Sequence, residues 1–358
     1  MKKTLAALVA LLASATCASA QGMTFYPAQN FTVIGKGFTD TETPLERLPV
    51  RLKGVTRDRV WYLGKNTSGL AIRFRTASKT IGARWELYEN TVMNHMAFVG
   101  IKGLDLYSLA DGKWQFVCTG RPAGKTTTAK IIENLSGEER EYLLYLPLYD
   151  GVLSLEIGVD SAATITKPNS PALQPGSPIV FYGTSITQGG CASRPGMAYP
   201  SILSRWLNRE VVNLGFSGNG RLDYEIAEAM ATIPAACYVI DCVPNVTADE
   251  IREKAARFVD IIRKAKPTTP IIMIENPLFP HTRFDTKLTT YVQDKNAEFR
   301  QVYEQRRRAG DRHITYIEAK NLIGHDQEAT VDGIHLTDLG FMRLAETVYP
   351  VFRRVLKQ

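Results

Sequence analysis

The second half of the chain alternates two hydrophobic patterns. Short apolar runs, as in buried strands, are each followed by a longer segment with apolar residues on one face, as in amphipathic helices. Thr247 and Glu250 form the capping-box pattern at the start of one such helix. Strands are expected at 179–182, 211–216, 238–243, 271–275 and 314–318, and helices at 197–208, 223–232, 247–264, 290–308 and 336–356. The pattern predicts a five-stranded, doubly wound parallel α/β sheet of flavodoxin-like order, with functional residues at the carboxyl ends of the strands.

Residues 21–163 follow a different pattern. Short segments rich in β-branched and aromatic residues alternate with turn residues, which is typical of an all-β sandwich. Asp111-Gly112 and Asp150-Gly151 are expected to form hairpin turns. The expected strands include 70–74, 81–87, 96–101, 114–117, 142–146 and 153–157.

A proline-rich segment separates the two patterns. Residues 164–178 read TITKPNSPALQPGSP, with four prolines and no sustained periodicity. Such a composition indicates a linker. We therefore expect a β-sandwich domain at 21–165, a linker at 166–177 and an α/β domain at 178–358.

The N-terminus has the pattern of an export signal. Two lysines precede an apolar run that is too short to span a bilayer, and Ala18-Ser19-Ala20 is a small-residue cleavage site. The mature chain is expected to begin at Gln21, in the periplasm or outside the cell. Two alternatives are a retained membrane anchor and a lipoprotein attached through Cys17. Outside this segment no run of 18 uncharged apolar residues occurs, so no transmembrane segment is expected in the mature chain.

Composition and charge exclude several classes of protein. The chain has 358 residues, of which 44% are hydrophobic and 22% are charged, as in globular proteins. The formal net charge is +7, and removal of Lys2 and Lys3 leaves +5. The remaining basic residues are interleaved with acidic ones, so the charge does not indicate a nucleic-acid partner.

Candidate chemistry gathers at the predicted strand ends. Ser185, in the sequence GTSIT, directly follows the first strand, where its hydroxyl would be exposed near outward-pointing amides. Asp332 and His335, in DGIH, are spaced to share a hydrogen bond within a turn. Gly218 in GFSGNGR and Asn245 in VPNV follow the second and third strands and could donate to a ligand oxygen. Each motif alone is also consistent with a helix cap, a phosphate-binding turn or a structural turn.

The ordered set resembles the SGNH, or GDSL-type, serine hydrolases. The matching positions are Ser185, Gly218, Asn245 and His335, in the family's order over about 180 residues. Thr184 stands where the family's first motif usually has Asp, and Val246 stands where Asp usually follows the Asn. The N-terminal half is similar to the β-sandwich that precedes this domain in some exported bacterial hydrolases, several of which resemble carbohydrate esterases.

The resemblance implies a role for each residue. Ser185 would be the nucleophile, His335 the general base and acid, and Asp332 the residue that orients His335. The amides of Ser185 and Gly218 and the side chain of Asn245 would form the oxyanion hole. No metal or organic cofactor is required for this chemistry.

The predicted substrate is an ester of a short acyl group, acetyl above all, on a polysaccharide. No long apolar lid is evident, and export with a β-sandwich favours a carbohydrate. His281 and Arg283, which follow the fourth strand, are candidate contacts for sugar hydroxyls, or else part of a surface loop. Met93-Asn94-His95 in the sandwich either reaches the same cleft or forms a structural turn. The alternatives are another class of esterase, such as a lipase or thioesterase, and a non-catalytic glycan-binding protein. The sugar, the acylated position, the acyl chain length, the role of the sandwich and the oligomeric state do not follow from the sequence.

The cysteines of the mature chain allow two interpretations. Cys118, Cys191, Cys237 and Cys242 include no C-x-x-C pair, and the histidines lack zinc-site spacing beside them, so no metal cluster is expected. Cys191 and Cys242 follow neighbouring strands of a flavodoxin-like sheet and could form a disulfide in an oxidising compartment. Alternatively, both are buried thiols that act as small apolar residues.

Overall fold

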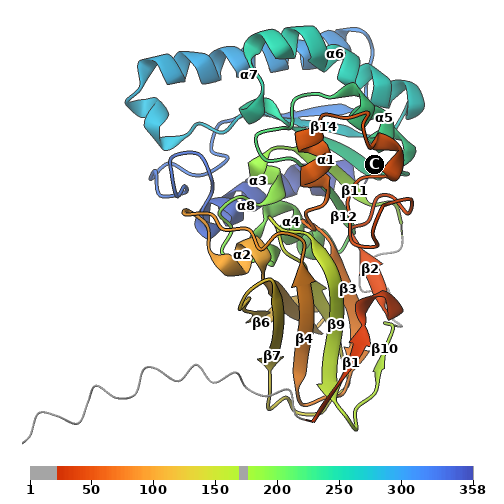
Figure 1. The fold of residues 1–358 in the computed structure, drawn as a ribbon. Coiled ribbons are helices and arrows are strands. Elements are labelled where there is room, and N and C mark those ends of the chain that lie inside the picture. The colour runs from red at the N-terminus through yellow and green to blue at the C-terminus, as the bar shows by residue number, and fades with distance from the viewer. Residues whose placement is uncertain (1–21, 169–175, 358) are drawn as a thin grey trace, which may run out of the picture.

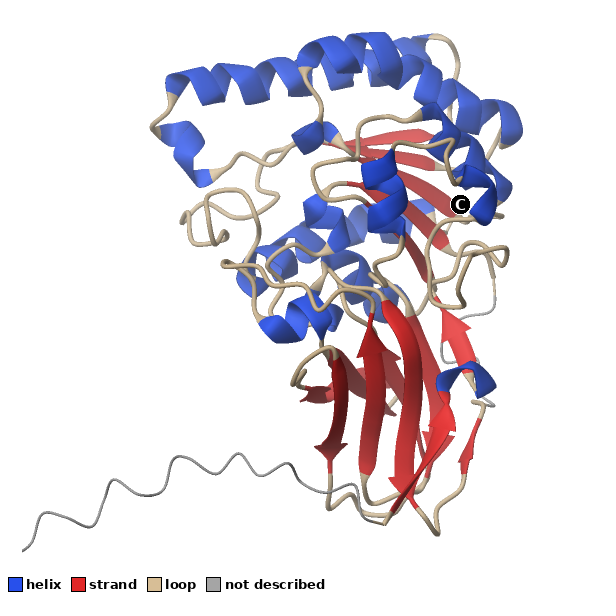
Figure 2. Ribbon diagram, in the orientation of Figure 1, coloured by secondary structure: helices blue, strands red, loops and turns tan. Residues whose placement is uncertain are grey.

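The computed structural model describes residues 22–168 and 176–357. A parallel sheet flanked by helices forms one part, and two antiparallel sheets form the other (Figures 1 and 2). The predicted signal segment, with Cys17, and most of the predicted linker lie outside the described residues. In the part that is described, no helix is both long and apolar enough to cross a membrane.

The parallel sheet has the predicted order. Its strands are arranged β12-β11-β13-β14-β15, so the first strand of the unit lies between the second and the third. Every residue of β11, β12, β13 and β14 is buried, which explains their uninterrupted apolar runs. The bounds are β11 Ile179–Gly183, β12 Val211–Gly215, β13 Cys237–Asp241, β14 Ile271–Ile274 and β15 Ile314–Ile317.

Helices cover both faces of this sheet, as predicted. One face packs against α5, α6 and α7, and the other against α4 and α8. Thr247 caps α6 through the predicted capping box with Glu250. Helix α7 begins four residues before the predicted start because the Asp285 side chain caps it. The bounds are α3 Ser185–Gln188, α4 Tyr199–Leu207, α5 Tyr224–Thr232, α6 Ala248–Ala265, α7 Thr286–Arg308 and α8 Asp338–Val355, with short 3-10 helices η3 Pro195–Met197, η4 Val243–Asn245 and η5 Pro280–Arg283.

The N-terminal half is a sandwich of two antiparallel sheets. One has the order β1-β9-β4-β7, and the other the order β10-β3-β8-β5-β6 with β2 beside β3. Side chains from both sheets, Trp85 and Phe74 among them, form one buried apolar cluster. The bounds are β1 Met23–Pro27, β2 Thr32–Ile34, β3 Ala71–Thr76, β4 Ile81–Leu87, β5 Leu104–Ala110, β6 Lys113–Gly120, β7 Thr126–Ile132, β8 Arg140–Tyr145, β9 Val152–Asp160 and β10 Ile165–Thr166, with helices η1 Ala28–Asn30, η2 Val50–Leu52, α1 Asp58–Gly64 and α2 Phe98–Lys102.

Two local predictions in this half are wrong. The segment 96–101, predicted as a strand, contains most of helix α2. Asp150-Gly151 is not a hairpin turn, because β8 and β9 belong to different sheets. The Asp150 carboxylate instead accepts hydrogen bonds from the amides of residues 89–91, which fixes the loop leading toward His95. Asp111-Gly112 does join the hairpin of β5 and β6, with both residues at positive φ.

The connection between β2 and β3 (residues 35–70) packs against the parallel sheet. Its apolar side chains, Leu48 and Leu63 among them, belong to the same buried cluster as Val212 and Leu214 of β12. The buried guanidinium of Arg47 donates to the carbonyls of Asn213 and Gly215 at 3.0 and 2.8 Å. Burial lowers the pKa of Arg47 to about 9. The two halves of the chain therefore share a core.

Of the two interpretations of Cys191 and Cys242, the disulfide is wrong. All four cysteines in the described part of the chain are free thiols. Cys242 lies in the apolar cluster on one face of the parallel sheet, and Cys191 lies in the cluster on the other face. The sheet separates the two thiols, so the alternative of buried cysteines describes them better.

Candidate active site

Ser185 begins a short helix directly after strand β11, the first strand of the parallel sheet along the chain. Strand β11 ends at Gly183, and Thr184 caps α3 through a capping box with Thr187. Gly189 ends the helix at a positive φ. This tight strand–helix turn places Ser185 among the first amides of a helix, which have no partners within the helix. The position suits a nucleophile whose reaction develops negative charge nearby.

Asp332 and His335 lie in one turn, as predicted. The Asp332 carboxylate is 2.7 Å from Nδ1 of His335, and it also accepts from the amides of Ile334 and His335 at 3.0 and 2.8 Å. Partial burial would raise the pKa of Asp332, but the hydrogen bonds from the His335 side chain and from these amides outweigh it and lower the pKa to about 2. The carboxylate therefore stays ionised and fixes the ring.

The other ring nitrogen of His335 faces Ser185. Nε2 lies 3.0 Å from Ser185 Oγ, although 150 positions separate the two residues along the chain. The imidazole thus joins the carboxylate to the hydroxyl in one hydrogen-bonded chain. In this geometry the imidazole can take the hydroxyl proton while the carboxylate stabilises its protonated form.

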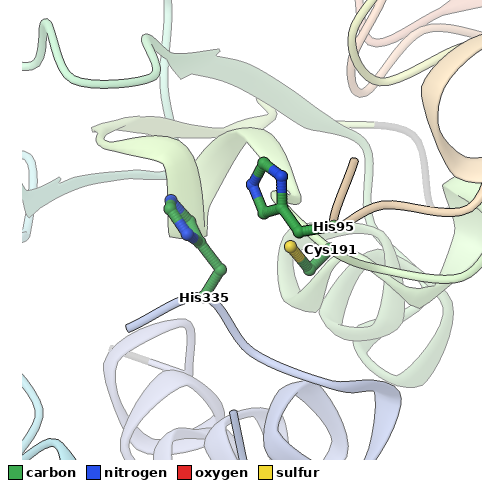
Figure 3. Close-up of side chains that lie close together, drawn as sticks. All are labelled: His95, Cys191 and His335. Carbon is green, nitrogen blue, oxygen red and sulfur yellow. The ribbon is translucent and has the colours of Figure 1, made fainter. Parts of the chain in front are cut away.

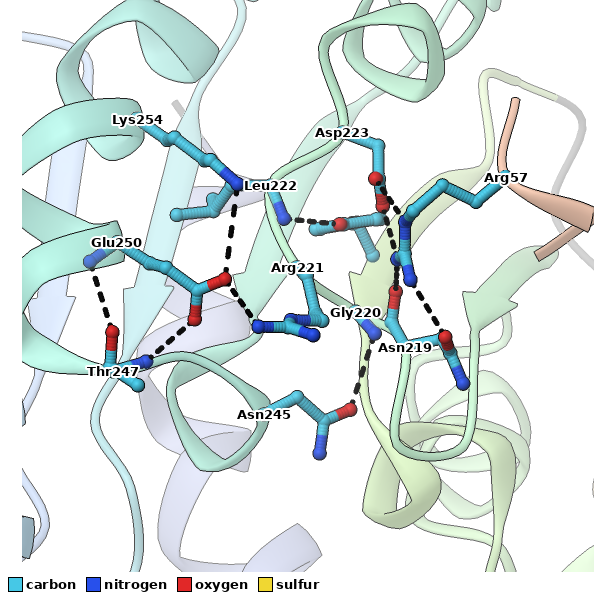
Figure 4. Close-up of polar contacts among 11 residues, drawn as sticks. Arg57, Asn219, Gly220, Arg221, Leu222, Asp223, Asn245, Thr247, Glu250 and Lys254 are labelled. Atoms are coloured by element: carbon cyan, nitrogen blue, oxygen red, sulfur yellow. Dashed lines mark hydrogen bonds and ion pairs between the residues drawn. The ribbon is translucent and has the colours of Figure 1, made fainter. Parts of the chain in front are cut away.

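The two other predicted donors lie on adjacent turns. The Asn245 Oδ1 atom accepts from the amide of Gly220 at 3.2 Å, and its amide nitrogen points to the opposite side (Figure 4). Gly220 in turn lies so close to Gly183 that an added Cβ would overlap the Gly183 carbonyl. Gly218 has φ +68° and open space where a Cβ would be. The arrangement leaves the Asn245 NH₂ group available to a ligand oxygen.

Sequence reasoning missed the groups that hold the turn containing Gly218. The Arg57 guanidinium, from the first half of the chain, donates to both carboxylate oxygens of Asp223 and to Oδ1 and the carbonyl of Asn219 at 2.7–2.9 Å (Figure 4). Gln188, at the end of α3, accepts from the amide of Ser217 at 2.9 Å. No motif marks either residue, because both act through contacts between distant segments.

A buried carboxylate supports the nucleophile turn from behind. Asp241, the last residue of β13, accepts from the hydroxyls of Thr187 and Tyr199, both at 2.7 Å. Thr187 also accepts from the amide of Thr184 at 3.1 Å. Burial raises the pKa of Asp241 to about 6, although the two hydroxyl donors oppose the shift. Asp241 thereby connects the neighbouring strand to the turn that carries Ser185.

His95 and Cys191 lie beside His335. The rings of His95 and His335 have centroids 5.5 Å apart, and the Cys191 sulfur points toward the space between them (Figure 3). The fold thus brings together residues from three separate segments, a proximity that spacing along the sequence does not reveal. Burial and the nearby Asp332 charge raise the pKa of the Cys191 thiol to about 12.

The predicted sugar contacts separate in the structure. His281, in η5, lies against the turn of Asp332, where an added Cβ on Gly333 would be 2.8 Å from its Nδ1 atom. Arg283 is exposed and lines a different hollow together with Lys320 and Gln327. Of the two, His281 is the one that the fold brings to the Ser185–His335–Asp332 cluster.

Comparisons with known proteins follow the same division of the chain. A family profile described as the GDSL-like lipase/acylhydrolase family matches residues 176–353. A second, described as the N-terminus of SGNH-hydrolase-type esterases, matches residues 23–165. The crystal structure of a GDSL-like lipase from Bacteroides ovatus ATCC 8483 is 40% identical, has a TM-score of 0.89, and covers 94% of this chain and 98% of its own. The chain belongs to the GDSL-like lipase/acylhydrolase family. It is an ester hydrolase of that family.

More distant structures share the fold of this GDSL-family hydrolase. The salicylyl-acyltransferase SsfX3 from a tetracycline biosynthetic pathway is 19% identical, with a TM-score of 0.73. A family two carbohydrate esterase from Cellvibrio japonicus is 12% identical, with a TM-score of 0.60. Each covers 94% of this chain and 98% of its own. A search of curated protein sequences finds no match.

The structure explains how this GDSL-family chain accommodates its two departures from the usual motifs. The Thr184 hydroxyl caps α3 by accepting from the amide of Ile186, which a side-chain oxygen of Asp would otherwise do. Val246 is buried in the apolar cluster under α6. Neither substitution alters the hydrogen-bonded chain of Ser185, His335 and Asp332.

Proposed function

We propose that the protein is an exported serine esterase that removes short acyl groups, acetyl above all, from carbohydrate. The observation that carries the proposal is the hydrogen-bonded chain from Asp332 through His335 to Ser185 at the carboxyl end of the parallel sheet. Such a chain is the minimal arrangement for nucleophilic attack on an ester carbonyl.

In this mechanism Ser185 Oγ attacks the carbonyl carbon as His335 Nε2 takes its proton. The protonated imidazole, stabilised by Asp332, then gives that proton to the departing sugar hydroxyl. Water then attacks the acyl-enzyme: its oxygen bonds to the acyl carbon as His335 takes one of its protons. The bond from that carbon to Ser185 Oγ breaks, His335 returns the proton to Ser185, and acetic acid leaves and ionises in solvent. No redox change occurs in either half-reaction.

The developing oxyanion requires donors that are already in place. The amides of Ser185 and Gly218 and the NH₂ group of Asn245 are the proposed donors. Asn245 is held by Gly220, and the Gly218 turn is held by Arg57 and Gln188, so little reorganisation is needed when charge develops. One such donor contributes about 3–4 kcal/mol to the transition state.

Features of the cluster and of the sequence favour a short acyl group on a polymer. The His335 side chain retains 23% of its accessible surface and Asp332 retains 35%. A site this open suits an acyl group projecting from a long chain better than an acyl chain that needs an apolar tunnel. The fold is shared with a carbohydrate esterase, and the export signal in the sequence fits an extracellular polysaccharide.

Acetate release from a panel of acetylated polysaccharides tests the substrate directly. The expected result is release from at least one polymer, and faster turnover of p-nitrophenyl acetate than of a long-chain p-nitrophenyl ester. Preference for the long-chain ester would favour a lipase, and failure of every ester would favour a glycan-binding role. N-terminal sequencing of the exported protein should begin at Gln21, whereas a lipid-modified Cys17 would contradict the proposed processing.

Substitution of Ser185 or His335 by Ala tests the roles assigned to them. Each variant is expected to lose nearly all esterase activity while its circular dichroism stays unchanged, because loss of a triad member typically removes several powers of ten in kcat. Retention of more than about a tenth of the wild-type kcat by either variant would contradict the assignment.

A further inference from the structure

We propose that His95, Cys191 and His335 form an inhibitory binding site for a soft divalent cation, zinc above all. One ligand atom from each residue lies within 4.8 Å of the others. Two imidazoles and a thiolate are the donor types that zinc prefers. The binding part of the proposal is independent of the reaction, and the inhibitory part rests on the proposed function.

The local contacts determine which atoms are available to the metal. Asp332 is hydrogen-bonded to Nδ1 of His335 at 2.7 Å, so Nε2 is the nitrogen that faces the cluster. Asn94 lies 3.1 Å from Nδ1 of His95, which leaves Nε2 of His95 as the second ligand. A carboxylate on the far nitrogen of a metal-binding histidine is the usual arrangement around zinc, and Asp332 already supplies it.

The geometry needs only a small adjustment. A tetrahedral zinc ion with bonds of about 2.0–2.3 Å places its ligand atoms about 3.5 Å apart. His95 is on a loop and only partly buried, so rotation of its side chain can close the difference. Cys191 is 6% exposed, and its sulfur already points toward the space between the two rings (Figure 3). Binding would form one Zn–S and two Zn–N bonds, and the thiol proton would pass to solvent.

Inhibition follows because metal binding and the proposed reaction use the same nitrogen atom of His335. Nε2 of His335 lies 3.0 Å from Ser185 Oγ and is the proposed acceptor of its proton. A metal ion bound to this nitrogen occupies the same lone pair. The hydroxyl then has no base, and removal of the ion restores the enzyme.

The test separates binding from activity by using Ser185→Ala, which retains all three ligands. Titration of this full-length variant with Co²⁺ should give a thiolate-to-cobalt charge-transfer absorption that saturates at one ion per chain, and Zn²⁺ should abolish it. Further substitution by Cys191→Ala should remove the absorption, and His95→Ala should weaken affinity by more than about tenfold. Cys118→Ala, which changes a cysteine in β6, is the matched control and should leave the titration unchanged.

The active enzyme provides the second readout. Zn²⁺ should inhibit the wild type, a chelator should restore its full activity, and His95→Ala should need more than about tenfold more Zn²⁺ for half-inhibition of its own activity. An absent cobalt–thiolate absorption, or one that survives Cys191→Ala, would overturn the site. A normal titration without inhibition of an active enzyme would overturn the inhibitory role alone. A wild type without esterase activity would refute the proposed function and leave the binding result intact.

Discussion

Asn245 combines two tasks in one side chain. Its oxygen is engaged by the amide of Gly220, so the orientation of its NH₂ group is fixed before any ligand arrives. Substitution Asn245→Ala should lower kcat about 10²–10³-fold with little change in KM, because the donor is needed mainly when the oxyanion forms. Steady-state kinetics with p-nitrophenyl acetate measures both constants. A change confined to KM would show that Asn245 binds the ground-state ester instead.

Asp241 makes the stability of the fold depend on pH. Its folded-state pKa of about 6 is above the ordinary value, so the folded protein holds a proton more tightly than the unfolded chain does. Between about pH 4 and pH 6, Asp241 is protonated in the folded state and ionised in the unfolded chain. Its contribution to the unfolding free energy therefore falls as the pH rises through this range. Above pH 6 the contribution is constant.

The variant Asp241→Asn removes this titration. The difference in unfolding free energy, variant minus wild type, should therefore increase from pH 4 to pH 6 by about 3 kcal/mol at most. Urea unfolding at several pH values measures it. Tyr199→Phe removes one hydrogen-bond donor to the Asp241 carboxylate and should raise the pKa of Asp241 further. The pH range over which stability falls should then extend to higher pH. Parallel stability curves for wild type and Asp241→Asn would contradict the prediction.

The sequence was most informative about residues whose roles depend on local spacing. Asp332 and His335 are three positions apart, so their hydrogen bond could be expected from spacing. Ser185 follows a recognisable strand, so its approach to His335 could be expected from the order of the strands. Arg57 and Gln188 could not be placed, because their contacts depend on how distant segments pack. The failed disulfide has the same cause: both cysteines were assigned to the correct strand ends but not to opposite faces of the sheet.

At the scale of elements, periodicity predicted the parallel sheet and its helices to within a few residues. It failed at 96–101, where an apolar, β-branched segment is helical. Gly100 of that helix, α2, lies so close to the carbonyl of Ala192 that a Cβ would overlap it. The helix is therefore selected by packing against the loop that follows α3, and the pattern of a single segment does not contain this information.

The turn of residues 217–223 shows how one element depends on another. Arg57 bonds to it at both Asn219 and Asp223, and Gly218 lies between Ser217 and this contact. Substitution Arg57→Ala should lower kcat about tenfold with little change in KM, because the turn then loses the geometry that the oxyanion requires. Arg57→Lys should recover part of kcat, since it keeps the charge without the forked donors.

The control for this position is Arg84→Ala. Arg84 forms an exposed ion pair with Glu156 in the sandwich, and its loss should leave both kinetic constants unchanged. Unchanged kcat in Arg57→Ala, with the fold intact, would show that the turn holds its shape without this contact.

For the whole molecule, the β2–β3 connection packs the first half of the chain against the parallel sheet of the second. Its apolar residues complete the core beside β12, and Phe38, Leu52 and Val60 lie in the cluster that includes Val212. A hydrolase domain prepared without residues 35–70 would expose that apolar surface. The packing therefore continues across the proline-rich segment, although the hydrophobic pattern of the sequence changes there.

Arg47 is the polar centre of that contact, and its loss should destabilise both halves together. Arg47 is 3% exposed, and its guanidinium donates to four carbonyls, those of Leu63, Asn66, Asn213 and Gly215. Arg47→Met fills similar volume but leaves these buried acceptors without their donors. We expect a loss of about 3–5 kcal/mol in unfolding free energy. Urea unfolding followed by tryptophan fluorescence and by circular dichroism should give one coincident transition for the wild type.

The position of the transitions in the variant decides between cooperative and independent halves. If the halves share a core, Arg47→Met shifts the single transition to lower urea for both probes, and Arg84→Met, an exposed control, shifts it by less than about 0.5 kcal/mol. If the halves fold independently, the fluorescence and circular dichroism curves no longer coincide. Only the transition of the parallel sheet then shifts to lower urea. The second result would contradict a shared core, because loss of the hydrogen bonds from Arg47 to the β12 carbonyls would then destabilise the parallel sheet alone.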